Sequence, residues 1–175
     1  MKNLTVTFAF LMISTAAYAQ STAETTGVNS TLGIPPKTED FVKEVSMSDF
    51  FEIESSKVAL QNGSAATKAF AQQMIEAHEK TTSELKALIE SGKVKAAAAT
   101  GMSDAQKTSI DELKGLSGKE FDEAYQADQE DAHEDAVDVF KRYGSEGDNA
   151  DLKAWAAATL PALEHHLKMA EDLDN

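Results

Sequence analysis

Residues 118–144 read GKEFDEAYQADQEDAHEDAVDVFKRYG, and this stretch predicts one long amphipathic helix. Its large apolar side chains recur every three or four residues, the spacing of one face of an α-helix. Nine carboxylates lie between Glu120 and Asp138 with no basic residue among them, which is typical of a solvated helix face. Ser117 to Glu120 has the capping-box pattern, and Gly144 is suited to end the helix. The side chains expected on the buried face are Phe121, Tyr125, Ala132, His133, Ala136, Val137 and Phe140.

The rest of the chain shows the same helical periodicity. Long amphipathic helices are predicted over residues 38–61, 65–91 and about 149–170, and a short helix is predicted to follow the capping box at Ser103. Short breaks join the first helix to the second and the third to the fourth, so each pair is expected to form an antiparallel hairpin. The link between the hairpins is long and contains the short helix. This connectivity predicts an all-α, ferritin-like four-helix bundle.

Composition limits the classes of function. The chain has 175 residues, no cysteine and a formal net charge of −14. It is long enough for one domain, and it can form neither disulfides nor thiolate metal sites. Because a strongly acidic protein repels nucleic acid and anionic lipid, we expect no nucleic-acid partner. The charge favours solubility and is compatible with a metal cation or a basic envelope partner.

The first residues have the pattern of a targeting signal. Lys2 precedes an apolar run over residues 4–13, and Ala17-Tyr18-Ala19 resembles a cleavage site. The run is short for a permanent anchor, although an uncleaved membrane anchor is the alternative. We therefore expect a periplasmic protein, free or envelope-associated, with no transmembrane segment in the mature chain. The expected organisation is a signal peptide over 1–19, a flexible leader over 20–37 that ends at a Pro-Pro pair, and the helical bundle over 38–175.

Several separated motifs carry a family resemblance. They are KAFAQQM at 68–74, His78, ELKAL at 84–88, LSGKEFDEAY at 116–125, His133, and TLPALEHHL at 159–167. Together they resemble the exported bacterial ferritin-like "domain of unknown function" family, whose members are often labelled outer membrane proteins. The resemblance covers about residues 38–173. It implies a ferritin-like bundle in the periplasm or envelope, and it implies no established reaction.

Three histidines are candidate metal ligands. His78, His133 and His166 fall on the buried faces of three different predicted helices, whereas His165 points away. Neutral imidazole binds zinc, copper and iron. Glu54 is the expected carboxylate partner, because Phe50, Phe51 and Val58 are its helical neighbours.

The predicted depths along the bundle give two layers, one with His78 and His133 and the other with Glu54 and His166. Glu52 has polar neighbours and is expected to be exposed. The alternative interpretation is that the histidines are hydrogen-bonded core residues and that Glu54 and His166 form a buried ion pair.

The usual di-iron chemistry of this architecture is not expected. Such a site needs a Glu from each of two helices and a Glu-x-x-His motif from each of the other two. The chain has one such motif, from Glu130 to His133. No phosphate-binding loop or catalytic triad has supporting context, so no catalytic residue is predicted.

Three functions remain open. The first is a non-catalytic periplasmic binding or stress-related module. The second is a metal-binding protein or metalloenzyme that holds zinc, copper or iron through the histidines. The third is an envelope-associated structural or interaction protein. The sequence predicts no particular oligomeric state.

Overall fold

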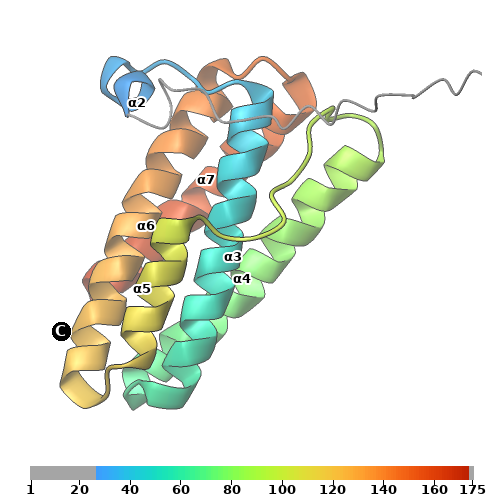
Figure 1. The fold of residues 1–175 in the computed structure, drawn as a ribbon. Helices are drawn as coiled ribbons and strands as arrows, with labels where there is room; N and C mark the ends of the chain where they lie inside the picture. The colour runs from blue at the N-terminus through green and yellow to red at the C-terminus, as the bar shows by residue number, and fades with distance from the viewer. Residues whose placement is uncertain (1–26, 174–175) are drawn as a thin grey trace, which may run out of the picture.

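The computed structural model describes residues 27–173, which form six helices and no strand. The prediction of an all-α helical bundle is confirmed, and Figure 1 shows the long helices running side by side. None of the helices within the described residues combines the length and the apolar character needed to cross a bilayer. The expected signal peptide lies outside these residues. The helices are α2 (Val28–Leu32), α3 (Thr38–Asn62), α4 (Ala65–Glu90), α5 (Asp104–Lys114), α6 (Gly118–Glu146) and α7 (Ala150–Glu171).

Side-chain hydrogen bonds cap the starts of three helices, α4, α5 and α7. Ser64 accepts a hydrogen bond from the Thr67 amide at the start of α4, and Asn149 accepts one from the Leu152 amide at the start of α7. The capping box predicted at Ser103 is confirmed, because both of its hydrogen bonds are present. The one predicted at Ser117 is wrong. Its side chain makes no capping bond, and the next residue, Gly118, adopts a left-handed φ of 60°.

Gly144 does not end its helix as predicted. Helix α6 continues to Glu146. A Cβ added at Gly144 would lie 3.1 Å from the backbone nitrogen of Ala157 and 3.2 Å from its Cα. The glycine therefore serves to let α6 and α7 approach closely.

The first described residues contact α6. The Ser30 hydroxyl donates to Asp138 at 2.8 Å, and Arg142 donates to the Ile34 carbonyl at 2.6 Å. The described part of the expected leader thus contains the short helix α2, which lies beside one end of α6 in Figure 1.

Two apolar clusters occupy the two ends of the bundle. One contains Phe41, Phe140 and Tyr143, and the other contains Phe70 and Phe121. Helix α3 packs chiefly against α4, and α6 packs chiefly against α7. On each of these four helices, the segment between the two clusters carries buried or partly buried polar side chains. A polar layer therefore crosses the middle of the core, and it consists of Asp49, Glu52, Ser55, Ser56, His78, Gln129, His133 and His166.

Candidate metal centre

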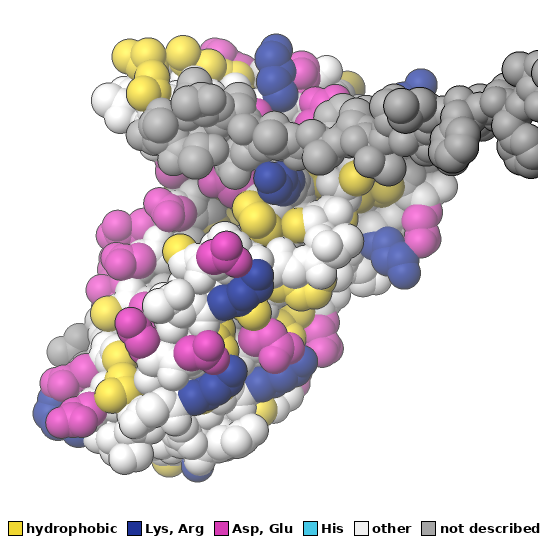
Figure 2. Space-filling model, viewed as in Figure 1, with side chains coloured by type: hydrophobic (Ala, Val, Ile, Leu, Met, Phe, Trp, Pro, Cys, Tyr) yellow, Lys and Arg dark blue, Asp and Glu magenta, His cyan; other side chains and the backbone are white. Residues whose placement is uncertain are grey.

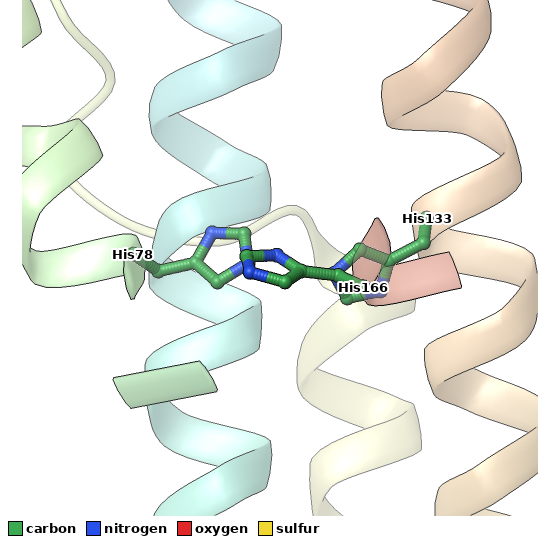
Figure 3. Close-up of side chains that lie close together, drawn as sticks. All are labelled: His78, His133 and His166. Atoms are coloured by element: carbon green, nitrogen blue, oxygen red, sulfur yellow. The ribbon is translucent and has the colours of Figure 1, made fainter. Parts of the chain in front are cut away.

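Three histidine side chains meet in the polar layer. His78 comes from α4, His133 from α6 and His166 from α7, and their rings point toward one another (Figure 3). The ring centroids lie 5.6 Å apart for His78 and His133, 5.9 Å for His78 and His166, and 5.5 Å for His133 and His166. One ring nitrogen of each lies within 4.8 Å of those of the other two. The structure thus brings together all three histidines singled out from the sequence.

The prediction that His166 lies in a separate layer is wrong. It placed His166 with Glu54 and away from His78, whereas His166 contacts both other histidine rings. The error lies in the estimated helix ends. The depth of His166 is counted from the C-terminal end of its own helix, but α7 ends at Glu171, and Ala170 lies beside Gln126, well inside α6. Helix α7 therefore stops short of the end of the bundle at which α6 begins, and His166 lies deeper than the count predicts.

Two of the histidines are oriented by hydrogen bonds from their outer nitrogens. Nδ1 of His78 lies 2.8 Å from Oδ1 of Asp49, and Nδ1 of His133 lies 2.8 Å from the Gln129 carbonyl oxygen. A carbonyl oxygen only accepts, so Nδ1 of His133 carries the hydrogen and Nε2 of the neutral ring has a free lone pair. Metal-binding histidines usually have such a carboxylate or carbonyl partner on the other nitrogen.

The inner atoms of the cluster have no hydrogen-bond partner. They are Nε2 of His78, Nε2 of His133 and Nδ1 of His166. Over residues 27–173, the only other buried side-chain nitrogen or oxygen atoms without a hydrogen-bond partner are Oε1 and Oε2 of Glu52 and Oε1 of Gln129. A buried polar atom without a partner costs roughly 1–3 kcal/mol. All of these costs are concentrated in one layer, so this layer is where the core departs from ordinary packing.

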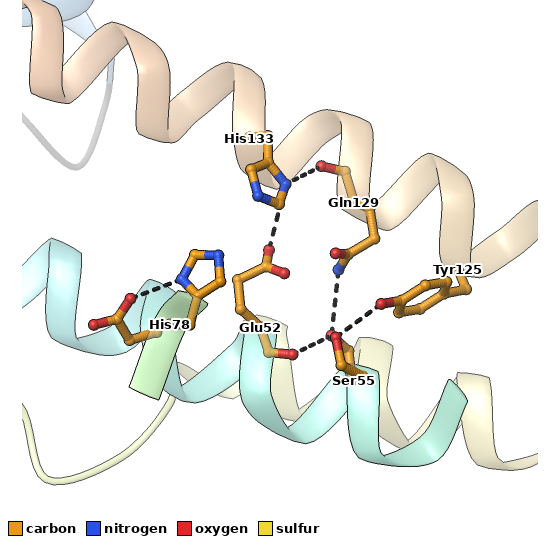
Figure 4. A network of polar contacts seen from close by, with 8 residues as sticks. Glu52, Ser55, His78, Tyr125, Gln129 and His133 are labelled. Atoms are coloured by element: carbon orange, nitrogen blue, oxygen red, sulfur yellow. Dashed lines mark hydrogen bonds and ion pairs between the residues drawn. The ribbon is translucent and has the colours of Figure 1, made fainter. Parts of the chain in front are cut away.

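Glu52 is the carboxylate of the site, contrary to the expectation from its neighbours. Its side chain is 1% exposed, and its Oε1 lies 3.9 Å from Nδ1 of His133 (Figure 4). Burial raises the pKa of Glu52 to about 7, against the opposing charge of His78. Glu54, the predicted carboxylate, instead pairs with Lys57 at 2.7 Å, and its side chain is about half exposed (46%). The structure does not bring Glu54 to the histidines.

The polar face of α3 explains why Glu52, and not Glu54, lies beside the histidines. Asp49, Ser55 and Ser56 are buried with Glu52, whereas Phe50 is 38% exposed. In this part of α3 the polar residues face the core, so polar neighbours indicated burial rather than exposure. The signal available in the sequence was the polar spacing itself, because positions 49, 52 and 56 lie on one helical face.

Further hydrogen bonds stabilise the part of the polar layer that lies next to Tyr125. The Gln129 amide donates to the Ser55 hydroxyl at 3.3 Å, and the Ser56 hydroxyl lies 2.8 Å from the Tyr125 hydroxyl. Ser55 also donates to the Glu52 backbone carbonyl (Figure 4). The first two of these contacts join α3 to α6 beside the histidines.

The charge states of the histidines differ. Burial and the charge of His78 lower the pKa of His133 to about 4 and that of His166 to about 3. Burial also lowers the pKa of His78, but its hydrogen bond to Asp49 and the charges of Glu52 and Asp49 outweigh this effect and raise it overall. At neutral pH, His133 and His166 therefore carry free lone pairs.

The donor set suits one ion rather than two. Three imidazole nitrogens and one carboxylate match the ligands that zinc, copper and iron accept. Glu130, which belongs to the single Glu-x-x-His motif, accepts a hydrogen bond from Gln126 instead of joining the cluster. The carboxylates of a di-iron site are thus not assembled around these histidines.

Comparison with known proteins gives a family match and no functional information. The model of the DUF4142 family, a domain of unknown function, matches residues 22–173. No curated protein and no solved structure matches the chain. The resemblance to a domain-of-unknown-function family is therefore confirmed.

Proposed function

The chain belongs to the DUF4142 family, and we propose that it binds one transition-metal ion in the middle of the bundle. The ligands are Nε2 of His78, Nε2 of His133 and Nδ1 of His166, with the Glu52 carboxylate beside the ion. The observation that carries the proposal is the convergence of three unpartnered, buried imidazole nitrogens from three helices.

A purely structural role for the histidines accounts for less of the geometry. A core histidine normally satisfies both ring nitrogens, because burying a polar atom without a partner is costly. Here the outer nitrogens of His78 and His133 are satisfied, and the inner ones are not. A metal ion would satisfy the three inner nitrogens together and would also balance the charge of Glu52.

The distances are compatible with an ion after a small adjustment. Zinc–nitrogen bonds of about 2.0–2.1 Å in a tetrahedral site place the nitrogens roughly 3.4 Å apart. One ring nitrogen of each histidine lies within 4.8 Å of those of the other two. Rotation of the rings about their side-chain bonds would close this gap without moving the helices. We therefore expect binding to tighten the middle of the bundle and to stabilise the fold.

The enclosure of the site favours binding over catalysis. His78 and His133 are 3% and 1% exposed, so their rings present little surface to a substrate even where a groove reaches them. We accordingly propose a non-catalytic metal-binding module. We further propose that the bundle has ferritin-like connectivity, which the α3–α4 and α6–α7 pairs and the long link containing α5 support. The pattern of residues 1–19 supports a periplasmic location.

Equilibrium titration tests the proposal. Protein freed of metal with a chelator is titrated calorimetrically with Zn²⁺, Cu²⁺ and Fe²⁺, the last under anaerobic conditions. We expect about one ion per chain for at least one metal, together with a raised melting temperature. The double variant His78→Gln/His133→Gln should remain helical by circular dichroism and lose this binding. Absence of binding by the wild type, or equal binding by the folded double variant, would overturn the proposal.

A further inference from the structure

A groove on the surface leads to the histidine cluster. It has a volume of about 690 Å³ and is lined chiefly by residues of α3, α5 and α6. His78 and Thr81 of α4, Ser30 of α2 and Leu163 of α7 also line it. His78 and Asp49 both contribute to its lining. The groove therefore connects the surface between α3, α5 and α6 with one of the proposed metal ligands.

One wall of the groove is acidic. Asp128, Asp131 and Asp135 lie on the same face of α6, at intervals of three and four residues, and all three line the groove. Figure 2 shows acidic side chains gathered along the side of the molecule that α6 forms. Among the described residues that line the groove, Arg142 is the single Lys or Arg, and it is paired with Asp138 at 2.8 Å.

The carboxylates of this wall repel one another. Burial and the charges of Asp131, Glu112 and Glu52 raise the pKa of Asp128 to about 6. A divalent cation in the groove would relieve this repulsion, whereas an anion would meet a field that excludes it.

The inner part of the groove carries an independent sign of a ligand. His78 is 3% exposed, and its Nε2 has no hydrogen-bond partner. An acidic surface alone is common on a protein with a net charge of −14. An acidic groove that reaches a buried, unpartnered imidazole combines attraction of cations at the surface with a ligand atom at depth.

We propose that this groove is the entry route by which hydrated divalent cations reach the metal centre, with Asp128, Asp131 and Asp135 attracting them. The inference rests on the proposed metal site. The groove then selects free cations over metals held in anionic complexes. It acts on the rate of loading rather than on the number of ions bound.

Loading kinetics test the route. Metal-free protein is mixed rapidly with Co²⁺, and binding is followed through the visible absorption of the bound ion at about 10 mM and 500 mM salt. The test variant is Asp128→Asn/Asp131→Asn/Asp135→Asn. The matched control is Glu76→Gln/Glu79→Gln/Glu164→Gln, which removes the same charge from exposed positions that do not line the groove.

We expect the groove variant to load at least ~10-fold more slowly than the wild type at low salt, with the difference shrinking at high salt. It should still reach the wild-type content of bound ion, and the control should load within about 2-fold of the wild-type rate. Loading of the groove variant at the control rate would overturn the route while leaving the metal centre intact. Absence of Co²⁺ binding by the wild type, where Zn²⁺ and Cu²⁺ also fail to bind, would overturn the metal centre itself and the route with it.

Discussion

Nδ1 of His78 on α4 lies 2.8 Å from Oδ1 of Asp49 on α3, and both side chains are buried. The contact turns the other nitrogen of His78 toward His133 and His166. It also raises the basicity of the ring, as a carboxylate partner does for metal-binding histidines. Asp49 is therefore a positioning residue for the proposed centre.

Replacing this carboxylate should weaken metal binding without unfolding the protein. We expect Asp49→Asn to lower metal affinity by about 10–100-fold, because the amide keeps the shape and loses the charge. Thr82→Val is the control, since it removes the other partner of Asp49, at 2.9 Å, and leaves the contact with His78. It should change affinity far less. Calorimetric titration of both variants measures the effect, and unchanged affinity in Asp49→Asn would show that the carboxylate does not support a ligand.

Glu52 should make opposite contributions to stability and to metal binding. Its folded-state pKa of about 7 exceeds the ordinary value of 4.5. As the pH rises, Glu52 therefore ionises first in the unfolded chain. The free-energy cost of holding its charge in the folded core is absent below pH 4.5, grows between pH 4.5 and pH 7, and is complete above pH 7. A shift of this size corresponds to about 3 kcal/mol.

Glu52→Gln is therefore expected to stabilise the metal-free protein at pH 8 by up to about 3 kcal/mol and to change it little at pH 4.5. Urea unfolding in the presence of chelator measures this difference. The same variant should bind metal more weakly, because the negative charge beside the ion is lost. A variant that is less stable than the wild type at pH 8 would indicate that Glu52 is stabilised by partners in the fold.

The pKa of His133 gives a second pH dependence of opposite sign. Its folded value of about 4 lies below the ordinary 6.5, so the unfolded chain takes up the proton first as the pH falls. Relative to His133→Gln, the metal-free wild type should lose up to about 2 kcal/mol of unfolding free energy between pH 7.5 and pH 5. Urea unfolding of both proteins at the two pH values tests this. If the difference in unfolding free energy between the two proteins is the same at both pH values, water already solvates the ring of His133.

A substitution at Gly144, where α6 lies close to α7, should change the stability of the fold without changing metal binding. Gly144→Ala should destabilise the fold by about 1–3 kcal/mol, because the new Cβ would press on the Ala157 backbone. The number of ions bound should not change. Gly101→Ala introduces a Cβ with nothing within 4 Å and should be close to neutral. Thermal unfolding measures both variants, and a neutral Gly144→Ala would show that the helices can separate slightly at this point.

Much of the fold follows from local sequence signals. The apolar periodicity predicts the long helices, and the caps at Ser64 and Ser103 mark the starts of α4 and of the short helix α5. Gly144 was misread because a glycine that ends a helix and one that permits close packing look the same in a sequence. The difference depends on Ala157, which lies on another helix.

The site was predictable only in part. Histidines on three apolar faces stand out in the sequence, so the three histidines of the proposed centre can be predicted without knowledge of their geometry. Glu52 was missed because its buried neighbours on α3 are themselves polar, and a rule that equates polar surroundings with exposure assigns it to the surface. The carbonyl of Gln129 that orients His133 belongs to the backbone and has no residue-specific signal.

The metal content of two variants that differ at adjacent positions shows whether the histidine cluster holds an ion. His166 belongs to the cluster, whereas His165 beside it is exposed and lies outside it. Untagged wild type, His165→Gln and His166→Gln are purified without chelator, and their metal is measured by elemental analysis. We expect near-stoichiometric metal in the wild type and in His165→Gln, and a large loss in folded His166→Gln. Equal metal in the two variants, or none in the wild type even after incubation with zinc, copper or iron, would contradict the proposed metal centre.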